Sequence, residues 1–209
     1  YSRANAAFAR RLNEGLQGHG KSTWFDQESI AGGTDFQEEI YSGIESCDNF
    51  LFILSAYSVE SPYCNDELVY ALKHHKRIIP VLYTAIDPLR PPEAIAKIQW
   101  IDFSQSQNFY ISLGELIRTM DTDRDHVRDH TRWLRRAAEW DQANRSHDLL
   151  LRGNEYALAD NWLQEAIRGD KFPAPLPLHR EWIEASGRAI RLEREREQRQ
   201  AATLRSLLT

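Results

Sequence analysis

The sequence is poor in cysteine, and the little it has forms no familiar site. Its 209 residues include only Cys47 and Cys64, with no C-x-x-C pair and no histidine spaced beside them as a metal ligand. Two isolated cysteines fit a reducing compartment, so we expect a cytoplasmic location and no metal site. As small apolar side chains, both cysteines also suit buried positions.

Three further features are missing from the sequence. No apolar run approaches the ~18 residues that a membrane-spanning helix needs, so we expect no membrane contact in this segment. The net charge of -5 leaves no basic excess to neutralise phosphates, which argues against nucleic acid as a partner. Neither G-x-G-x-x-G spacing nor a Walker-type lysine motif is present, which disfavours a Rossmann dehydrogenase or a P-loop NTPase.

The composition nevertheless supports a large core. Hydrophobic residues make up 42% and charged residues 27% of the chain, which is typical of a globular protein. From residue 4 to Met120, apolar segments of strand type alternate with amphipathic helical stripes. This alternation predicts an α/β fold with a doubly wound parallel sheet, in which ligands bind at the carboxyl ends of the strands. We predict helices over 4–17, from 36, over 62–75 and over 109–120, and strands over 23–26, 49–54, 77–82 and 100–103.

From about Asp121 onward the pattern is helical only. Three amphipathic stripes follow one another, and three prolines separate the second stripe from the third. We therefore predict two domains, 1–120 and 121–209, of which the second is an all-α helical extension toward a further domain. The stripes contain Trp133, Trp162 and Trp182, and the prolines are Pro173, Pro175 and Pro177.

Five short motifs stand in order along the predicted α/β domain. They are Tyr1-Ser2-Arg3, Trp24-Phe25-Asp26, Ile30-Ala-Gly-Gly-Thr-Asp-Phe36, Ile53-Leu-Ser55 and Cys64-Asn-Asp-Glu67-Leu68. In this order and spacing, they resemble the TIR (Toll/interleukin-1 receptor) family over about residues 1–120. The resemblance implies a flavodoxin-like sheet whose first strand ends near Tyr1, so we expect an apolar strand before Tyr1 that this sequence omits.

The same resemblance implies an activity. Enzymes of this family cleave NAD+ at the bond between nicotinamide and ribose, and their essential glutamate stands at the C-x-x-E position, which is Glu67 in this sequence. A carboxylate suits that chemistry because bond breaking develops oxocarbenium character on the ribose, as in glycoside hydrolysis. The resemblance thus predicts an NAD+ nucleosidase, either a hydrolase or an ADP-ribosyl cyclase, with NAD+ as substrate and no cofactor.

Five other residues are candidates for binding the substrate. Arg3 and Ser2 suit the phosphates of the dinucleotide, although Arg3 is equally readable as a surface arginine. Asp26 suits either a ribose hydroxyl or a loop amide, and Phe36 suits either the ligand or the core. Tyr63 lies one helical turn before Glu67, with Tyr70 next along, and so offers a stacking surface where the family's enzymes usually carry tryptophan. Without the motifs around it, Glu67 reads as an ordinary solvated helix glutamate.

The loop at Gly32, Gly33, Thr34 and Asp35 resembles the family's assembly element, which contacts a neighbouring domain. Other TIR domains are therefore expected partners, through self-association that switches on the enzyme. The helical extension resembles the segment that follows TIR domains in large bacterial proteins with sensor modules. This implies an effector role in bacterial antiviral defence or signalling.

Two other functions stay open at this point. Many TIR domains resemble non-enzymatic adaptors that work only through TIR–TIR contact, and the fold alone does not separate these from enzymes. Glu67 with an aromatic residue one turn before it favours catalysis. A flavodoxin-like receiver is the weaker alternative, because the acidic cluster expected at the end of the first strand is not seen.

Overall fold

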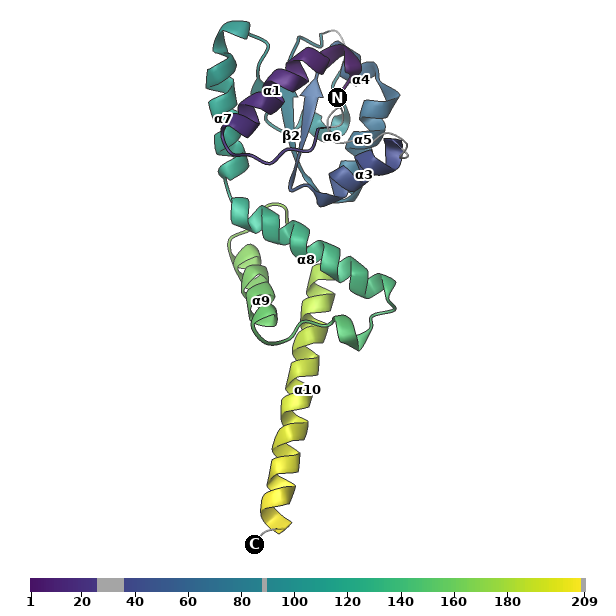
Figure 1. Cartoon of the computed structure of the whole chain (residues 1–209), viewed down its shortest axis with the longest axis vertical. Helices are drawn as coiled ribbons and strands as arrows, with labels where there is room; N and C mark the ends of the chain where they lie inside the picture. The colour runs from purple at the N-terminus through teal and green to yellow at the C-terminus, as the bar shows by residue number, and fades with distance from the viewer. Residues whose placement is uncertain (26–35, 88–89, 208–209) are drawn as a thin grey trace. The chain divides into compact units, whose positions relative to one another are not determined.

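The computed structural model describes residues 1–25, 36–87 and 90–207 (Figure 1). It separates into two compact units, Tyr1–Arg124 and Asp125–Thr209, which we name unit 1 and unit 2. Unit 1 contains a sheet with helices around it. The described part of unit 2 contains helices joined by loops and no strand.

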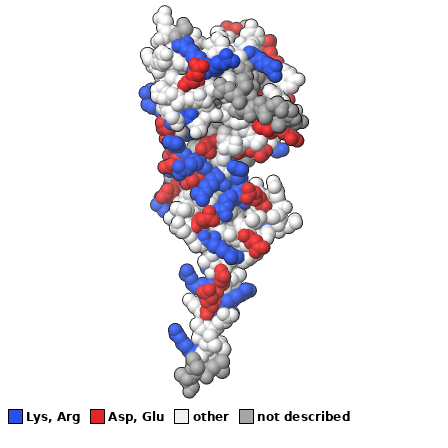
Figure 2. Space-filling model, in the orientation of Figure 1, with Lys and Arg blue, Asp and Glu red and all other residues white. Residues whose placement is uncertain are grey.

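Charged side chains of both signs are mixed on the molecular surface. Figure 2 shows Lys and Arg side chains interspersed with Asp and Glu side chains over the visible face. Many are paired, as in the contacts of Arg136 with Glu155 and of Arg145 with Glu181, both at 2.7 Å. Exposed pairs of this kind stabilise a protein by less than about 1 kcal/mol each. None of the helices in the described ranges has the length and apolar character required to cross a bilayer.

The sheet of unit 1 has three parallel strands in the order β1 (Asn49–Leu54), β2 (Arg77–Leu82) and β3 (Ile101–Asp102). The register places Leu54 beside Leu82 and Leu82 beside Asp102, so the carboxyl ends of all three strands meet at one edge. The structure confirms the α/β class and the strands predicted over 49–54 and 77–82. The third strand is shorter than the predicted 100–103, since only two residues pair.

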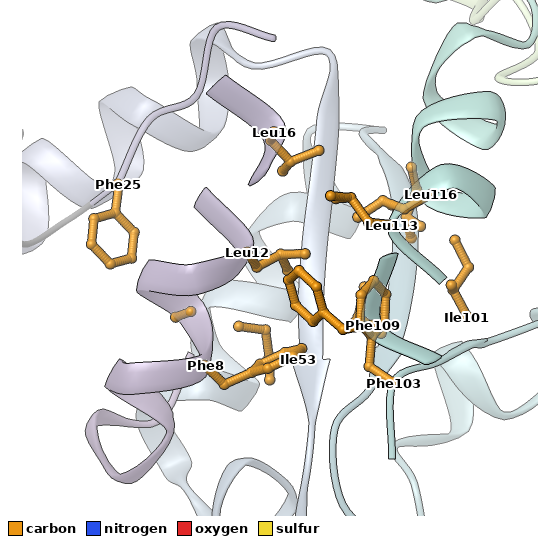
Figure 3. Close-up of a cluster of buried hydrophobic side chains, with 13 residues drawn as sticks. Phe8, Leu12, Leu16, Phe25, Ile53, Ile101, Phe103, Phe109, Leu113 and Leu116 are labelled. Carbon is orange, nitrogen blue, oxygen red and sulfur yellow. The ribbon is translucent and has the colours of Figure 1, made fainter. Parts of the chain in front are cut away.

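One face of the sheet is covered by α1 (Ala6–Gly18) and α7 (Phe109–Asp121), both of which were predicted. Because side chains alternate along a strand, Ile53 of β1 and Ile79 of β2 point toward these helices. Figure 3 shows the side chains of this cluster between the helices and the sheet. Its buried members are Phe8, Ala9, Leu12, Leu16, Phe25, Ile53, Ile79, Val81, Ile101, Phe103, Phe109, Leu113 and Leu116.

The opposite face is covered by α3 (Phe36–Ser46) and α5 (Pro62–Lys73). Phe52 and Leu54 of β1, which alternate with Ile53, point to this side and pack with Ile40 and Ile44 of α3. The inward stripe of α5 consists of Cys64, Leu68 and Ala71, all of which are buried. Helices therefore cover both faces of the strands, as near-continuous apolar strand sequences require.

Serine residues start two consecutive helices after β1. Ser55 and Ser58 form a reciprocal capping box at the start of α4 (Ala56–Glu60), and Ser61 Oγ accepts from the Cys64 amide at 3.3 Å at the start of α5. Pro62 occupies the first turn of α5, where its missing N–H leaves no bond unmade. The helix α5 was predicted, whereas α4 was not. The remaining short helices are η1 (Arg3–Asn5), α6 (Glu93–Ala96) and η2 (Ser106–Asn108).

The strand predicted over 23–26 is wrong for its described part. Residues 21–25 belong to no strand, and Asp26 lies outside the described residues. A β-prone segment becomes a strand only when a neighbour supplies ladder partners, and among the described residues none pairs with it. The segment is held by side chains instead. Phe25 stacks on Tyr1 at 5.5 Å between ring centroids, and the Trp24 indole lies against Gly43 of α3.

An aromatic stack joins α3 to α5 on their outer sides. The ring of Tyr70 lies between the ring of Tyr41, at 4.0 Å, and that of His74, at 4.3 Å. The Tyr70 hydroxyl donates to Oε1 of Glu45, and this hydrogen bond, with burial as a second cause, raises the pKa of Tyr70 to about 12. Burial lowers the pKa of His74.

Unit 2 consists of α8 (Arg124–Gln142), η3 (His147–Leu149), α9 (Gly153–Arg168) and α10 (Pro177–Leu207), and α8 begins at the last residue of unit 1. The predicted stripes form its core, in which Trp133 and Trp182 are almost completely buried. The core residues are Trp133, Ala137, Trp140, Leu151, Ala159, Trp162, Leu163, Trp182 and Ile183.

Three buried histidines hold the connection between α9 and α10. His126 Nε2 bonds the Pro173 carbonyl at 2.9 Å, and His130 Nε2 bonds the Ala174 carbonyl at 3.2 Å. His179 accepts from the Leu176 amide through Nδ1 at 3.0 Å. Side chains thus supply partners to backbone groups that no helix satisfies.

Gly43 tests how residues 21–25 attach to α3. A Cβ at this position would lie 2.6 Å from Cδ2 of Trp24, so Gly43→Ala should lower the free energy of unfolding by about 1–3 kcal/mol through overpacking. In a Trp24→Ala background, where the indole is absent, Gly43→Ala should instead raise the free energy of unfolding by about 1 kcal/mol, because alanine has the higher helix propensity. Urea unfolding of the two single variants and the double variant measures both effects. The same loss in both backgrounds would contradict the packing of Trp24 on α3.

Ionisation of Tyr70 should make the stability of unit 1 depend on pH in the alkaline range. Because its folded pKa is raised, the hydrogen bond to Glu45 contributes fully below about pH 10 and is lost as the pH rises through about 12. Glu45→Gln removes the charged acceptor and should return the pKa of Tyr70 toward about 10. Phenolate absorbance, taken as the difference from Tyr70→Phe in each background, measures the midpoint. An unchanged midpoint in Glu45→Gln would show that Glu45 does not hold the phenol.

Candidate functional site

Glu67 lies in the first half of α5, the second helix after the end of β1. Cys64 and Leu68 point into the core, which leaves Glu67 on the flank of the helix with 21% of its side chain exposed. A carboxylate in this setting is partly shielded from water and still reachable by a ligand. The strand end itself is buried, since Leu54 and Ser55 are both fully covered.

The first residues of the chain lie against this carboxylate. The backbone nitrogen of Tyr1 is 3.3 Å from Oε2 of Glu67, in a partly buried setting. Among the described residues, no hydrogen bond is seen to the other oxygen, Oε1. The structure thus brings residues 1–3 and Glu67 together.

Arg3 and Phe36 form the next contact. The guanidinium carbon of Arg3 lies 5.7 Å from the centre of the Phe36 ring, within the range of a cation–π interaction. Phe36 is 45% exposed, so its ring is not a core residue but a partly open surface under Arg3. Ser2 immediately precedes Arg3 and accepts the Asn5 amide through its carbonyl at 2.8 Å. A hydroxyl and a guanidinium therefore follow Tyr1 directly along the chain.

Tyr63 stands one turn before Glu67 on α5 and is 80% exposed. No hydrogen bond or ring contact involving Tyr63 is seen within the described ranges. Its ring is therefore a free aromatic face beside the carboxylate. Tyr70, the next aromatic residue of the stripe, does not join it, because Tyr70 is turned into the stack with Tyr41 and His74.

Five of the sequence-predicted residues lie outside the described residues. They are Asp26 of the candidate binding set and Gly32, Gly33, Thr34 and Asp35 of the predicted assembly loop.

A buried polar network next to the site was missed by the sequence analysis. Ser55 Oγ donates to Oδ1 of Asn5 at 2.8 Å, and both side chains are at least 97% covered. Ser55 and Ser58 bond each other through side chain and backbone at the start of α4. The spacing of the two serines was a readable sign of a helix start, whereas the pairing with Asn5, 50 residues away, had no local signal.

The described residues contain no group of three or more His, Cys, Asp or Glu side chains placed to hold a metal ion. What the site does contain is a half-shielded carboxylate, a guanidinium with an adjacent hydroxyl, and an open aromatic ring. These groups are suited to a ligand that combines sugar hydroxyls, phosphates and a flat ring.

Comparison with known proteins gives the chain its family. A family model described as TIR domain matches residues 1–117. Among solved structures, the TIR domain of the Toll-related receptor TRR-2 from the lower metazoan Hydra magnipapillata is similar, with a TM-score of 0.50 and 21% identity. The similarity covers 57% of this chain and 93% of that one, and at this identity it shows the fold alone. No curated protein matches the chain. The family match covers more than half of the sequence and fits the fold of unit 1, and the chain therefore belongs to the TIR domain family.

Proposed function

We propose that unit 1 is an NAD+ nucleosidase that cleaves the bond between nicotinamide and ribose. The observation that carries this proposal is the position of Glu67, a partly shielded carboxylate with an open ring at Tyr63 one helical turn away. Family membership alone would not distinguish an enzyme from an adaptor.

The main task of the protein in this reaction is to stabilise the positive charge that develops on the ribose. The C1′–N bond breaks, its electron pair leaves with neutral nicotinamide, and the ribose gains oxocarbenium character. Glu67 stabilises that positive charge and accepts hydrogen bonds from the ribose hydroxyls. Water that attacks C1′ loses a proton and gives ADP-ribose, whereas attack by a nitrogen of the adenine ring gives a cyclic product.

The neighbouring residues supply binding. Ser2 and Arg3 are the donors for the pyrophosphate, since a guanidinium and a hydroxyl both suit phosphate oxygens. Stacking of Arg3 on Phe36 limits the freedom of the guanidinium, so less entropy is lost when a ligand binds. Tyr63 offers a stacking surface for the nicotinamide or adenine ring. Asp26, which lies outside the described residues, stays a candidate for a ribose hydroxyl or a loop amide.

We further propose that activity requires contact between TIR domains, through the loop at residues 32–35. Two glycines suit a loop that changes shape on association, so that a neighbouring chain completes the substrate site. The biological consequence that the family resemblance suggests is NAD depletion or signalling in antiviral defence, in the cytoplasm. The competing function is a TIR–TIR adaptor without catalysis, which the following measurement separates from an enzyme.

Glu67→Gln should reduce nicotinamide release from NAD+ by at least about 100-fold, because the variant keeps the side-chain shape and loses the charge that stabilises the ribosyl cation. The assay uses the purified chain at high concentration or on a crowding surface. Asp66→Asn is the matched control, since Asp66 is a neighbouring carboxylate on the exposed face of α5 and should leave the rate unchanged. No release by the wild type, even when assembled, would favour the adaptor.

Tyr63→Ala should raise KM about 2-fold to 10-fold with a smaller effect on kcat, because stacking contributes roughly 0.5–1.5 kcal/mol to binding. Tyr63→Trp should retain or lower KM. Tyr57→Ala is the control, because Tyr57 is an exposed tyrosine on the adjacent helix α4 and plays no part in the proposed site. Steady-state kinetics of the three variants decide the point. Equal KM values for Tyr63→Ala and wild type would remove Tyr63 from the binding site.

A further inference from the structure

Asn5 is a polar residue in an unusual place. It ends η1 and precedes α1, and only 3% of it is exposed. Its Oδ1 accepts a hydrogen bond from Ser55 Oγ at 2.8 Å, and its backbone N–H donates to the Ser2 carbonyl at 2.8 Å. Burial of an asparagine is costly unless its side chain is bonded. Asn5 therefore closes the turn at residues 2–5 and fastens that turn to the end of β1.

The partner of Asn5 is itself fixed on several sides. Ser55 is fully buried, and its Oγ accepts the Ser58 amide at 3.2 Å while donating to Asn5. Ser58 Oγ accepts the Ser55 amide at 2.9 Å and donates to the Ser55 carbonyl at 3.0 Å. Three hydrogen bonds to Ser58 therefore fix Ser55 at the junction of β1 and α4 independently of its bond to Asn5.

From α4 the connection continues into the helix that carries Glu67. The Asn65 side chain of α5 donates to the Val59 carbonyl of α4 at 3.3 Å, and Ser61 caps α5. Two turns of rigid helix then lead to Glu67, whose carboxylate returns to the Tyr1 nitrogen at 3.3 Å. These contacts form a closed circuit that runs through residues 1–5, the end of β1, α4 and α5.

We propose that Asn5 is a positioning residue for the NAD+ site, acting through Ser55 to set where residues 1–3 stand relative to Glu67. The inference rests on the proposed function for its kinetic consequence. Asn5 touches no substrate, because it is buried and bonded to Ser55 and the turn. Without the Asn5–Ser55 bond, the hydrogen bond from the Asn5 backbone N–H to the Ser2 carbonyl would still shape the turn, but that bond does not join the turn to the strand end.

A purely structural role makes a different prediction from a positioning role. A buried asparagine that only fills the core would lower stability when replaced, while the folded fraction would keep its kcat. A positioning residue lowers kcat in fully folded protein, since a misplacement of about 1 Å can cost a factor of 100. Asn13 is the matched control, because it is an asparagine buried to a similar degree on the inward face of α1 and lies two turns from this circuit.

The experiment compares Asn5→Ala, Asn5→Asp and Asn13→Ala with wild type in nicotinamide release from NAD+, well below the unfolding temperature of each variant. Asn5→Ala should lower kcat roughly 10-fold to 100-fold. Asn5→Asp, which keeps an acceptor for Ser55 Oγ, should recover most of that loss, and Asn13→Ala should lower stability with kcat unchanged. A wild-type kcat in Asn5→Ala, or equal losses in Asn5→Ala and Asn13→Ala, would overturn the proposal.

A second readout keeps this test separate from the proposed function. Amide hydrogen exchange should become faster at residues 2–6 in Asn5→Ala, while the amides of β1 and of the middle of α5 keep their protection. If the wild type releases no nicotinamide, the proposed function fails and exchange alone decides the role of Asn5. Unchanged exchange at residues 2–6 would overturn the positioning role whatever the activity.

Discussion

The packing of α5 against the sheet is the constraint on which the candidate site depends. Cys64, Leu68 and Ala71 are buried against β1 and β2, which fixes the rotation of the helix about its axis. Because residues four apart share a face, that rotation puts Tyr63 and Glu67 together on the flank. Because β1 and β2 are parallel, the chain between them starts at the edge where β1 ends, and α5 lies in that connection. Hydrophobic burial in the core therefore determines where a charged side chain stands at the surface.

The candidate site also depends on residues 1–3, which are distant from Glu67 in the sequence and lie next to it in the structure. Residues 1–3 do so because the turn after them is tied to Ser55 through Asn5, and because Phe25 stacks on the ring of Tyr1 from the other side. A charge-stabilising carboxylate works best when its surroundings are fixed before the ligand arrives. At the strand end, buried polar side chains hold the turn in place through directional hydrogen bonds. Apolar packing alone is not directional and would hold the turn less firmly.

The sequence predicted those elements whose formation depends on their own pattern of residues. β1, β2, α5 and α7 carry continuous apolar runs or helical stripes, and Ser61 with Pro62 marks a helix start, so each could be predicted locally. Residues 23–25 could not, because strand formation depends on a neighbour that the local sequence does not reveal. The pairing of Asn5 with Ser55 could not be predicted either, because the two residues are far apart in the sequence. The same holds for the bonds of His126 and His130 to the connection between α9 and α10. The family motif singled out Glu67; its nearness to Tyr1 and the separate stacking of Tyr70 came only from the tertiary structure.

The central claim is that NAD+ binds with its nicotinamide ribose against Glu67 and its phosphates near Arg3. A crystal structure of the Glu67→Gln variant soaked with NAD+ tests this most directly, because the variant should bind the substrate without consuming it. The account predicts ribose hydroxyls within hydrogen-bond distance of residue 67 and phosphate oxygens on Ser2 or Arg3. NAD+ bound elsewhere on unit 1, or with its ribose pointing away from residue 67, would contradict it.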